Sequence, residues 1–321
     1  MGVNLDNTNR WRADVAESVK AYNEWFLASA PKAFREQRVE AVEKVRAALV
    51  QTSHLTRLDH TTLERHPEVL PSLRMATCPP LARDRLVGLA DVKKSLIEKM
   101  EKEGALPPRT PRPELRPQLS RVGSVLAGLI DRDVCPWITA GRAPAGDEAK
   151  IAAIVIADRL CGVVANPIIR NAQEKRQLAC VSDWLSARHY RQIPPGDPDD
   201  PASMPPGTFA FHMNVVGWMD DHGSKTVKIP VDIVIKAREA SPTDLPLFVE
   251  AKSAGDFTNV NKRRKEEASK ARHLLRRYGA GTQFVLFLGG YFDPGYLGYA
   301  AADRIDWVWE HRVGDFAGLG L

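Results

Sequence analysis

The chain has 321 residues, of which 44% are hydrophobic and 26% are charged, and its formal net charge is +5. This is ordinary globular composition, long enough for one large domain or two smaller ones. The small positive excess only weakly favours an anionic partner, so the position of the basic residues matters more than their number. No phosphate-binding GxxxxGK[ST] loop, HExxH motif or CxxC pair occurs, which argues against a nucleotide-driven motor and a zinc site.

The sequence also lacks features of export or membrane insertion. Its N-terminus has no apolar core of the signal-peptide type, and the longest apolar run, residues 151–165, is interrupted by Asp158 and Arg159. Its four cysteines are too few and too scattered for a disulfide framework. We therefore expect a cytoplasmic protein with free thiols and no membrane segment.

Helical patterns dominate the first half of the chain. Apolar residues recur at three- and four-residue spacing in residues 12–30, 32–51 and 81–104, where Gly104 is placed to end a helix. The proline-rich stretch 105–119 predicts an extended surface connection, and residues 122–133 predict another short helix. Turn residues near 145 indicate a boundary. We expect a helical N-terminal domain over residues 1–145 and a second domain over residues 146–321.

The second half changes from helices to strands. Residues 146–165 and 166–190 predict two helices, the second capped by Asn166 with Pro167 in its first turn. Runs at 209–216, 225–236 and 246–252 predict three strands, followed by a basic helix at 261–278 and strands at 282–292 and 304–311. Adjacent strands favour an antiparallel meander, and the strand–helix–strand order favours one parallel crossover. The expected fold is α/β, with a mixed central sheet flanked by helices.

Three charged residues lie on two successive predicted strands. Alternation places Asp232 on one face of its strand, opposite a core face that carries Val231, Ile233 and Ile235. In the next strand Glu250 and Lys252 are two residues apart, so they share one face. If the strands are neighbours, the two carboxylates can converge with the lysine beside them.

Converging carboxylates of this kind suit a metal-dependent hydrolase. They repel each other, and a divalent cation, Mg²⁺ for hard oxygen ligands, relieves the repulsion. Metal-bound water is a better nucleophile. The lysine is placed to orient or deprotonate that water, or to neutralise the developing charge. The pattern therefore predicts hydrolysis of a phosphodiester.

The segment PVDIVIK, followed by LFVEAK, resembles the signature of PD-(D/E)xK nucleases, with Pro230-x-Asp232 and Glu250-Ala-Lys252 in its positions. Here the proline stands one residue further from the aspartate than in the strict PD pair. Longer stretches, such as CGVVANPIIRNAQEKRQL and VEAKSAGDFTNVNKRRKEEASKA, resemble the XamI family of type II restriction endonucleases, and the similarity extends through much of the chain. The resemblance implies a PD-(D/E)xK core and Mg²⁺-dependent cleavage of double-stranded DNA at a short palindrome, GTCGAC.

The resemblance also implies roles for residues. Asp232 and Glu250 would bind Mg²⁺, and Lys252 would assist the attacking water. Glu174, on the helix before the sheet, would support the metal site, although a solvated ion pair with a basic neighbour is an equal alternative.

Partners follow from the same resemblance. Cutting both strands of a palindrome is most simply done by a homodimer. The helical N-terminal domain would grip DNA or form the dimer surface. A protective methyltransferase would be a separate protein.

The basic helix is the predicted contact to the DNA backbone. Its apolar stripe runs from Ala268 and Ala271 through Leu275 to Tyr278 and is expected to pack on the sheet, which turns Lys270 toward solvent. Contacts to phosphate oxygens are expected from its N-terminal part and the loop before it. The candidate DNA-binding residues are Asn259, Asn261, Lys262, Arg263, Arg264 and Lys265.

Other interpretations stay open. A PD-(D/E)xK nuclease of DNA repair or recombination would cut by structure or from ends. A DNA-binding protein without catalysis would use the basic helix to bind DNA, with a catalytic site that has decayed. A salt-bridge network of Asp232, Glu250 and Lys252 in an unrelated protein would show no metal dependence. The eight histidines form no cluster, and we expect all of them to be structural or surface residues.

Overall fold

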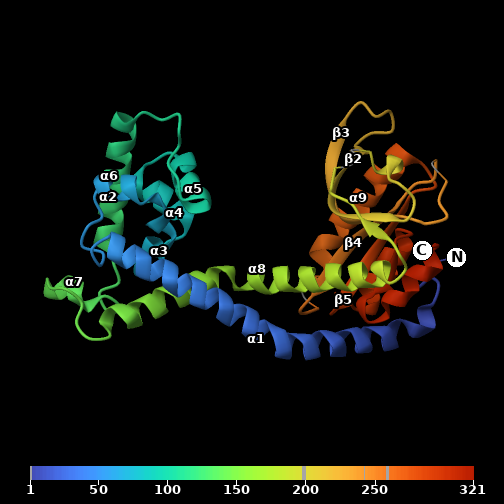
Figure 1. The fold of residues 1–321 in the computed structure, drawn as a ribbon, viewed down its shortest axis with the longest axis horizontal. Helices are drawn as coiled ribbons and strands as arrows, with labels where there is room; N and C mark the ends of the chain where they lie inside the picture. The colour runs from blue at the N-terminus through green and yellow to red at the C-terminus, as the bar shows by residue number, and fades with distance from the viewer. Residues whose placement is uncertain (1, 197–199, 242, 258–259) are drawn as a thin grey trace. The chain divides into compact units, whose positions relative to one another are not determined.

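The computed structural model describes residues 2–196, 200–241, 243–257 and 260–321, and of residues 163–166, 168 and 260–264 it describes only the backbone. The chain forms two compact units. One consists of Met1–Pro31 and Arg170–Leu321, and the other of Lys32–Ile169. Figure 1 labels α1 to α9 and β2 to β5, and the names used below follow it.

Two long helices contribute residues to both units. Helix α1 spans Trp11–Gln51 and contains Pro31, and helix α8 spans Glu148–Ser186 and contains Pro167. The prediction that a new helix starts at Asn166 is wrong, because a proline removes one backbone hydrogen bond and can leave the helix running on either side. The division between the units lies inside these helices, whereas the expected boundary near residue 145 falls within the second unit. None of the described helices is both long and apolar enough to cross a membrane.

The unit Lys32–Ile169 is helical. Its apolar faces form one core around side chains such as Leu63, Leu119 and Trp137. Besides its parts of α1 and α8, it contains α2 (His60–Arg65), η2 (Pro67–Val69), α3 (Leu70–Met75), α4 (Arg83–Ala90), α5 (Lys94–Glu103), α6 (Arg112–Leu129) and α7 (Pro136–Ala140).

Local backbone chemistry explains where these helices begin and end. Gly104 ends α5 with φ of 58°, as predicted. Asp91 also adopts a left-handed conformation, so the helical pattern of residues 81–104 forms two helices, α4 and α5. The prediction of an extended stretch at 105–119 is wrong over its second part, where α6 begins at Arg112. Proline is well tolerated in a first helical turn, because the N–H it lacks has no partner there.

In the described part of the chain, six strands form one mixed sheet in the order β1-β2-β3-β4-β5-β6. The meander of β2, β3 and β4 and the parallel pairing of β4 with β5 confirm the prediction. The parallel pair β5 and β6 adds a second crossover that was not predicted. The elements are β1 (Arg191–Gln192), β2 (Thr208–Trp218), β3 (Thr226–Lys236), β4 (Leu247–Ala254), α9 (Val260–Tyr278), β5 (Gln283–Gly290), α10 (Pro294–Ala302) and β6 (Asp306–Trp309).

Both faces of the sheet are covered. On one face, Leu274 of α9 and Leu297 of α10 pack with Phe248 of β4. On the other face, Leu185 of α8 and Phe316 of the 3-10 segment η4 (Glu310–Leu319) complete a second core. Short 3-10 turns, η1 (Thr8–Arg10) and η3 (Pro201–Ser203), complete this unit. Two-sided burial makes the central strands a rigid platform for side chains at their ends.

Candidate active site

Asp232 lies where the alternation of buried side chains along β3 changes phase. Val231 packs in the core beneath α9 and α10, whereas Ile233 and Ile235 pack in the core beneath α8. The prediction that these three residues share one core face is therefore wrong. The neighbouring strand is irregular at the same level: His212 has φ of 54°, and the pairing of β2 with β3, both fully described, skips His212 and Asp232.

Strands β3 and β4 separate at the level of the carboxylates. Their regular pairing ends with Ile233 opposite Val249, so the next step of the same register sets Asp232 opposite Glu250. At that point the backbone N–H of Ala251 donates to Asp232 Oδ2 at 2.8 Å, so a side-chain carboxylate accepts where a strand carbonyl would. The divergence gives both carboxylates access to the same space between the strands.

That space is a cavity of about 180 Å³ within one compact unit. The strands supply its two carboxylates and Lys252, and the C-terminal part of α8 supplies the opposite wall. The predicted residues Asp232, Glu250, Lys252 and Glu174 therefore meet at one place. The lining residues are Arg170, Gln173, Glu174, Gln177, Asp232, Glu250, Ala251, Lys252 and Ser253.

Glu250 is the most deeply buried acidic group of this cavity. Only 3% of its side chain is exposed. Its Oε1 accepts from Lys252 Nζ at 2.7 Å and from Lys270 Nζ at 2.6 Å. Its Oε2 is also buried, yet it has no hydrogen-bond partner among the described residues. A buried carboxylate oxygen without a partner is costly, so this atom is free to accept a cation.

The pKa values of Asp232 and Lys252 indicate which charge each group carries near neutral pH. Burial, and then the nearby Glu250 carboxylate, raise the pKa of Asp232 to about 6. Burial alone would lower the pKa of Lys252, but its contact with Glu250 outweighs burial and the pKa is raised. Lys252 is therefore an ammonium group at neutral pH, and Asp232 can exchange its proton for a cation close to neutrality.

Glu174 lines the cavity from α8 and is much more exposed than Glu250. Its side chain is 42% exposed, and its Oε1 lies 3.8 Å from His212 Nδ1. Asp232, Glu250 and Glu174 do not form a group of three ligand atoms within 4.8 Å; in the part of the chain that the structure describes, such a group occurs elsewhere. A role of Glu174 in holding a metal ion stays a prediction.

Gln177 is a residue of this site that sequence reasoning missed. It is 1% exposed, and its Nε2 donates to the carbonyl oxygens of Lys252 at 3.1 Å and Phe287 at 3.3 Å. It thus ties β4 to β5 beside Glu250 and Lys252. Its position three residues after Glu174 places both on one face of α8, and that spacing was the available signal.

Lys270 also belongs to the site, contrary to the prediction that it faces solvent. On α9, Ala268 is buried and Ala271 and Tyr278 pack against the core, as predicted. The inner stripe differs from the predicted one at one position, because Leu274 is fully buried and Leu275 is 47% exposed. Lys270 precedes Leu274 by four residues and follows the buried Glu267 by three, which places it on the inner side. The packed helix face, rather than composition, decides which basic residue reaches the carboxylates.

A second cavity, of about 430 Å³, lies between β3 and α9, and we call it the lysine groove. Lys270 connects the lysine groove with the cavity of Glu250. Its Nζ binds Glu250 and also donates, at 3.2 Å, to the carbonyl of Pro230, a residue that lines the groove. The groove is lined by Val227, Lys228, Ile229, Pro230, Lys265, Glu266, Ser269, Lys270 and His273.

The predicted DNA-binding residues are only partly described. Lys265 is exposed and lines the lysine groove. Asn259 lies outside the described residues. Of Asn261, Lys262, Arg263 and Arg264 the structure describes the backbone alone, in the first turns of α9. Their contacts to DNA stay predictions.

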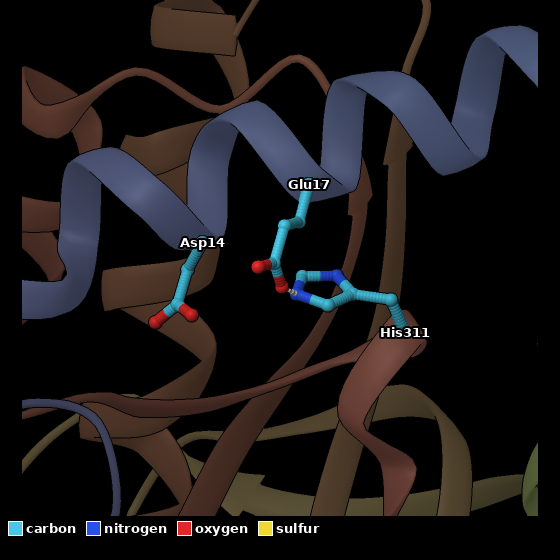
Figure 2. Close-up of side chains that lie close together, drawn as sticks. All are labelled: Asp14, Glu17 and His311. Atoms are coloured by element: carbon cyan, nitrogen blue, oxygen red, sulfur yellow. Dashed lines mark ion pairs between the residues drawn. The ribbon is translucent and has the colours of Figure 1, made fainter.

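A separate group of possible ligands lies at the start of α1. Figure 2 shows Asp14 and Glu17 on one side of this helix, with the Glu17 carboxylate at the ring of His311. The ligand atoms of the three residues lie within 4.8 Å of one another. The buried Asp14 already pairs with Arg312 at 2.8 Å and with Arg10 at 3.7 Å. Because arginines balance its charge, the group is explained as an ion-pair network that joins α1 to η4.

Comparison with known proteins extends these observations to the whole chain. The family model for XamI restriction endonuclease matches residues 53–309. The type II restriction enzyme SalI of Streptomyces albus G is 47% identical over 318 residues, which cover 99% of each chain. No solved structure matches the chain. These matches span the helical unit and the sheet alike, and the chain belongs to the XamI restriction endonuclease family.

Proposed function

We propose that this restriction endonuclease hydrolyses double-stranded DNA at the cavity where Asp232, Glu250 and Lys252 meet. The observation that carries the proposal is the Oε2 atom of Glu250, which is buried and unpartnered beside a second carboxylate. The strands that hold the pair diverge, and a helix and a parallel strand follow them. This arrangement supports the assignment of a PD-(D/E)xK core.

Asp232 and Glu250 are the residues that would hold Mg²⁺. Both offer hard oxygen atoms, and Mg²⁺ is commonly held by one or two carboxylates together with substrate phosphate. Bound there, the ion supplies Lewis acidity at the scissile phosphate. The Ala251 N–H bond to Asp232 Oδ2 fixes the orientation of that carboxylate, which leaves its other oxygen for the cation.

Lys252 acts as a positive hydrogen-bond donor in this proposal. Its raised pKa favours the ammonium form, which stabilises negative charge on the phosphate oxygens or holds the attacking water. Removal of a proton from that water by Lys252 is the less favoured of the roles open to it. Gln177 supports Lys252 by fixing the carbonyl of the same residue.

The proposed substrate is duplex DNA with the palindrome GTCGAC. A two-fold symmetric sequence is matched by a homodimer in which each subunit addresses one half-site. The helical unit Lys32–Ile169 would grip DNA or supply the dimer surface. A separate methyltransferase would protect the host sequence.

Cleavage of long unmethylated linear DNA, with Mg²⁺ and then with EDTA, tests the proposal. We expect discrete fragments with Mg²⁺ alone, ending at GTCGAC, and no fragments from DNA in which one base pair of each site is changed. A smear from linear DNA, with closed circles left intact, would identify a nuclease that acts from ends. A salt-sensitive mobility shift without cleavage would leave a DNA-binding protein.

A further inference from the structure

We propose that Lys270 is a positioning residue shared between the metal site and the DNA backbone. In the metal-free enzyme its ammonium group holds Glu250. When the cation binds, Lys270 leaves the carboxylate and binds a phosphate in the lysine groove. The inference rests on the proposed function, because it takes Asp232 and Glu250 as the metal ligands.

The contacts of Glu250 show why one lysine has to move. Both ammonium groups contact the same oxygen, at 2.7 Å for Lys252 and 2.6 Å for Lys270. Both lysines are largely buried, with 18% and 25% of their side chains exposed. Like charges repel strongly at such distances where water is scarce. A divalent cation at Glu250 therefore competes with an ammonium group that already neutralises the carboxylate.

The origin of each lysine indicates which one gives way. Lys252 lies on the same strand as Glu250, two residues away, and Gln177 holds its backbone carbonyl. Lys270 comes from a different element, α9, and already makes a second contact, to the carbonyl of Pro230 at 3.2 Å. That carbonyl belongs to a residue of the lysine groove. Lys270 can thus turn from the carboxylate to the groove, which Lys252 is not placed to do.

The groove offers Lys270 an anionic partner once DNA is present. Lys228 and Lys265 line it together with Lys270, and Glu266 is the acidic residue among the lining side chains. This positive excess in a groove beside the reactive carboxylates suits the phosphates that flank the cut bond. Displacement by the metal would therefore couple cation binding to the grip on the DNA backbone.

Metal binding without DNA gives the direct test. Lys270→Gln removes the charge and keeps a polar side chain, so we expect it to bind Mn²⁺ about tenfold more tightly than the wild type. Binding is measured from the electron paramagnetic resonance signal of free Mn²⁺. Lys265→Gln is the matched control, because Lys265 lies on the same helix and groove but is not one of the two lysines that bind Glu250 in the structure. It should leave Mn²⁺ affinity unchanged. Lys270→Arg, which retains the charge, should return the affinity to within about twofold of the wild type.

DNA binding tests the second half of the proposal. In Ca²⁺, Lys270→Gln should bind duplex DNA more weakly than the wild type, and the slope of log affinity against log salt should fall by about one. In EDTA, where Glu250 retains the lysine, the same substitution should change DNA affinity far less. Equal losses in Ca²⁺ and EDTA would show a fixed phosphate contact and overturn the exchange.

The wild-type protein provides a measurement that needs no variant. Acetylation of Lys270 by a limiting reagent, followed by mass spectrometry, should become faster when Mn²⁺ is added without DNA, while that of Lys252 stays slow. Unchanged acetylation of Lys270, or Mn²⁺ binding by Lys270→Gln no tighter than the wild type, overturns the proposal. Glu250→Gln separates the two levels of inference. If Glu250→Gln binds Mn²⁺ as tightly as the wild type, the metal site itself is wrong. If Glu250→Gln loses Mn²⁺ binding while Lys270→Gln binds Mn²⁺ no differently from the wild type, only the role of Lys270 is rejected.

Discussion

At the scale of single residues, Asp232 is expected to destabilise the metal-free fold. Its pKa is raised from 3.8 to about 6, so the folded state favours the protonated carboxyl. The contribution of Asp232 to the free energy of unfolding is therefore most favourable below its ordinary pKa and falls as the pH rises through about 6. Asp232→Asn removes this cost, and in EDTA at pH 7.5 it should raise the free energy of unfolding by about 1–3 kcal/mol. Urea unfolding at pH 7.5 and pH 4 checks this, since the gain should vanish at the lower pH.

Glu250 carries the second residue-scale prediction. Glu250→Ala should abolish cleavage, because it removes the buried oxygen proposed to bind the cation. DNA binding should persist or tighten, because a carboxylate that repels phosphate is lost and two lysines are released. Cleavage assays with Mg²⁺ and binding assays with Ca²⁺ measure the two effects separately. Cutting by Glu250→Ala would place the metal site elsewhere.

Glu174 provides a graded comparison with Glu250. Because its side chain is 42% exposed and it lies on α8 rather than on the strands, Glu174→Ala should slow cleavage far less than Glu250→Ala does. A rate for Glu174→Ala as low as that of Glu250→Ala would make Glu174 a metal ligand in the presence of DNA. A rate equal to the wild type would leave it a surface residue paired with His212.

At the scale of elements, local patterns predicted strands β2 to β6, the meander and the first crossover, because alternation and β-branched runs are set by nearby residues. They did not predict the two-residue β1. What the patterns missed depends on contacts between elements. Helix α8 continues past Pro167, and the phase change at Asp232 accompanies an irregular neighbouring strand. The inner stripe of α9 differs from the predicted one by a single residue, Leu274 in place of Leu275, and that step hid Lys270. The E-x-K pattern still brought the central residues together, since spacing along a strand fixes the face.

Gln177 links α8 to β4 and β5 beside the site, so its substitution should weaken the packing between these elements. Gln177→Leu leaves the carbonyls of Lys252 and Phe287 without this donor, so we expect a loss of about 1–3 kcal/mol in the free energy of unfolding. Cleavage should also slow, because the backbone beneath Lys252 is less firmly held. Asn171→Leu is the control on the same helix, since Asn171 is exposed and does not line the cavity. Equal cleavage rates in the two variants would remove Gln177 from the site.

At the scale of the whole molecule, the residues that the structure describes bring the proposed catalytic side chains together at one cavity in each chain, whereas a duplex has two strands to cut. Two subunits related by a two-fold axis would present two such cavities to a palindrome. Sedimentation of the protein on a duplex with one GTCGAC site should therefore give a dimer, and a monomer on DNA would contradict it. Mixed dimers of wild-type and Glu250→Ala subunits give the sharper test. On supercoiled DNA with one site they should accumulate nicked circles, because one cavity cuts its strand while the other is inactive. Direct linearisation by the mixed dimer would show that a single cavity cuts both strands.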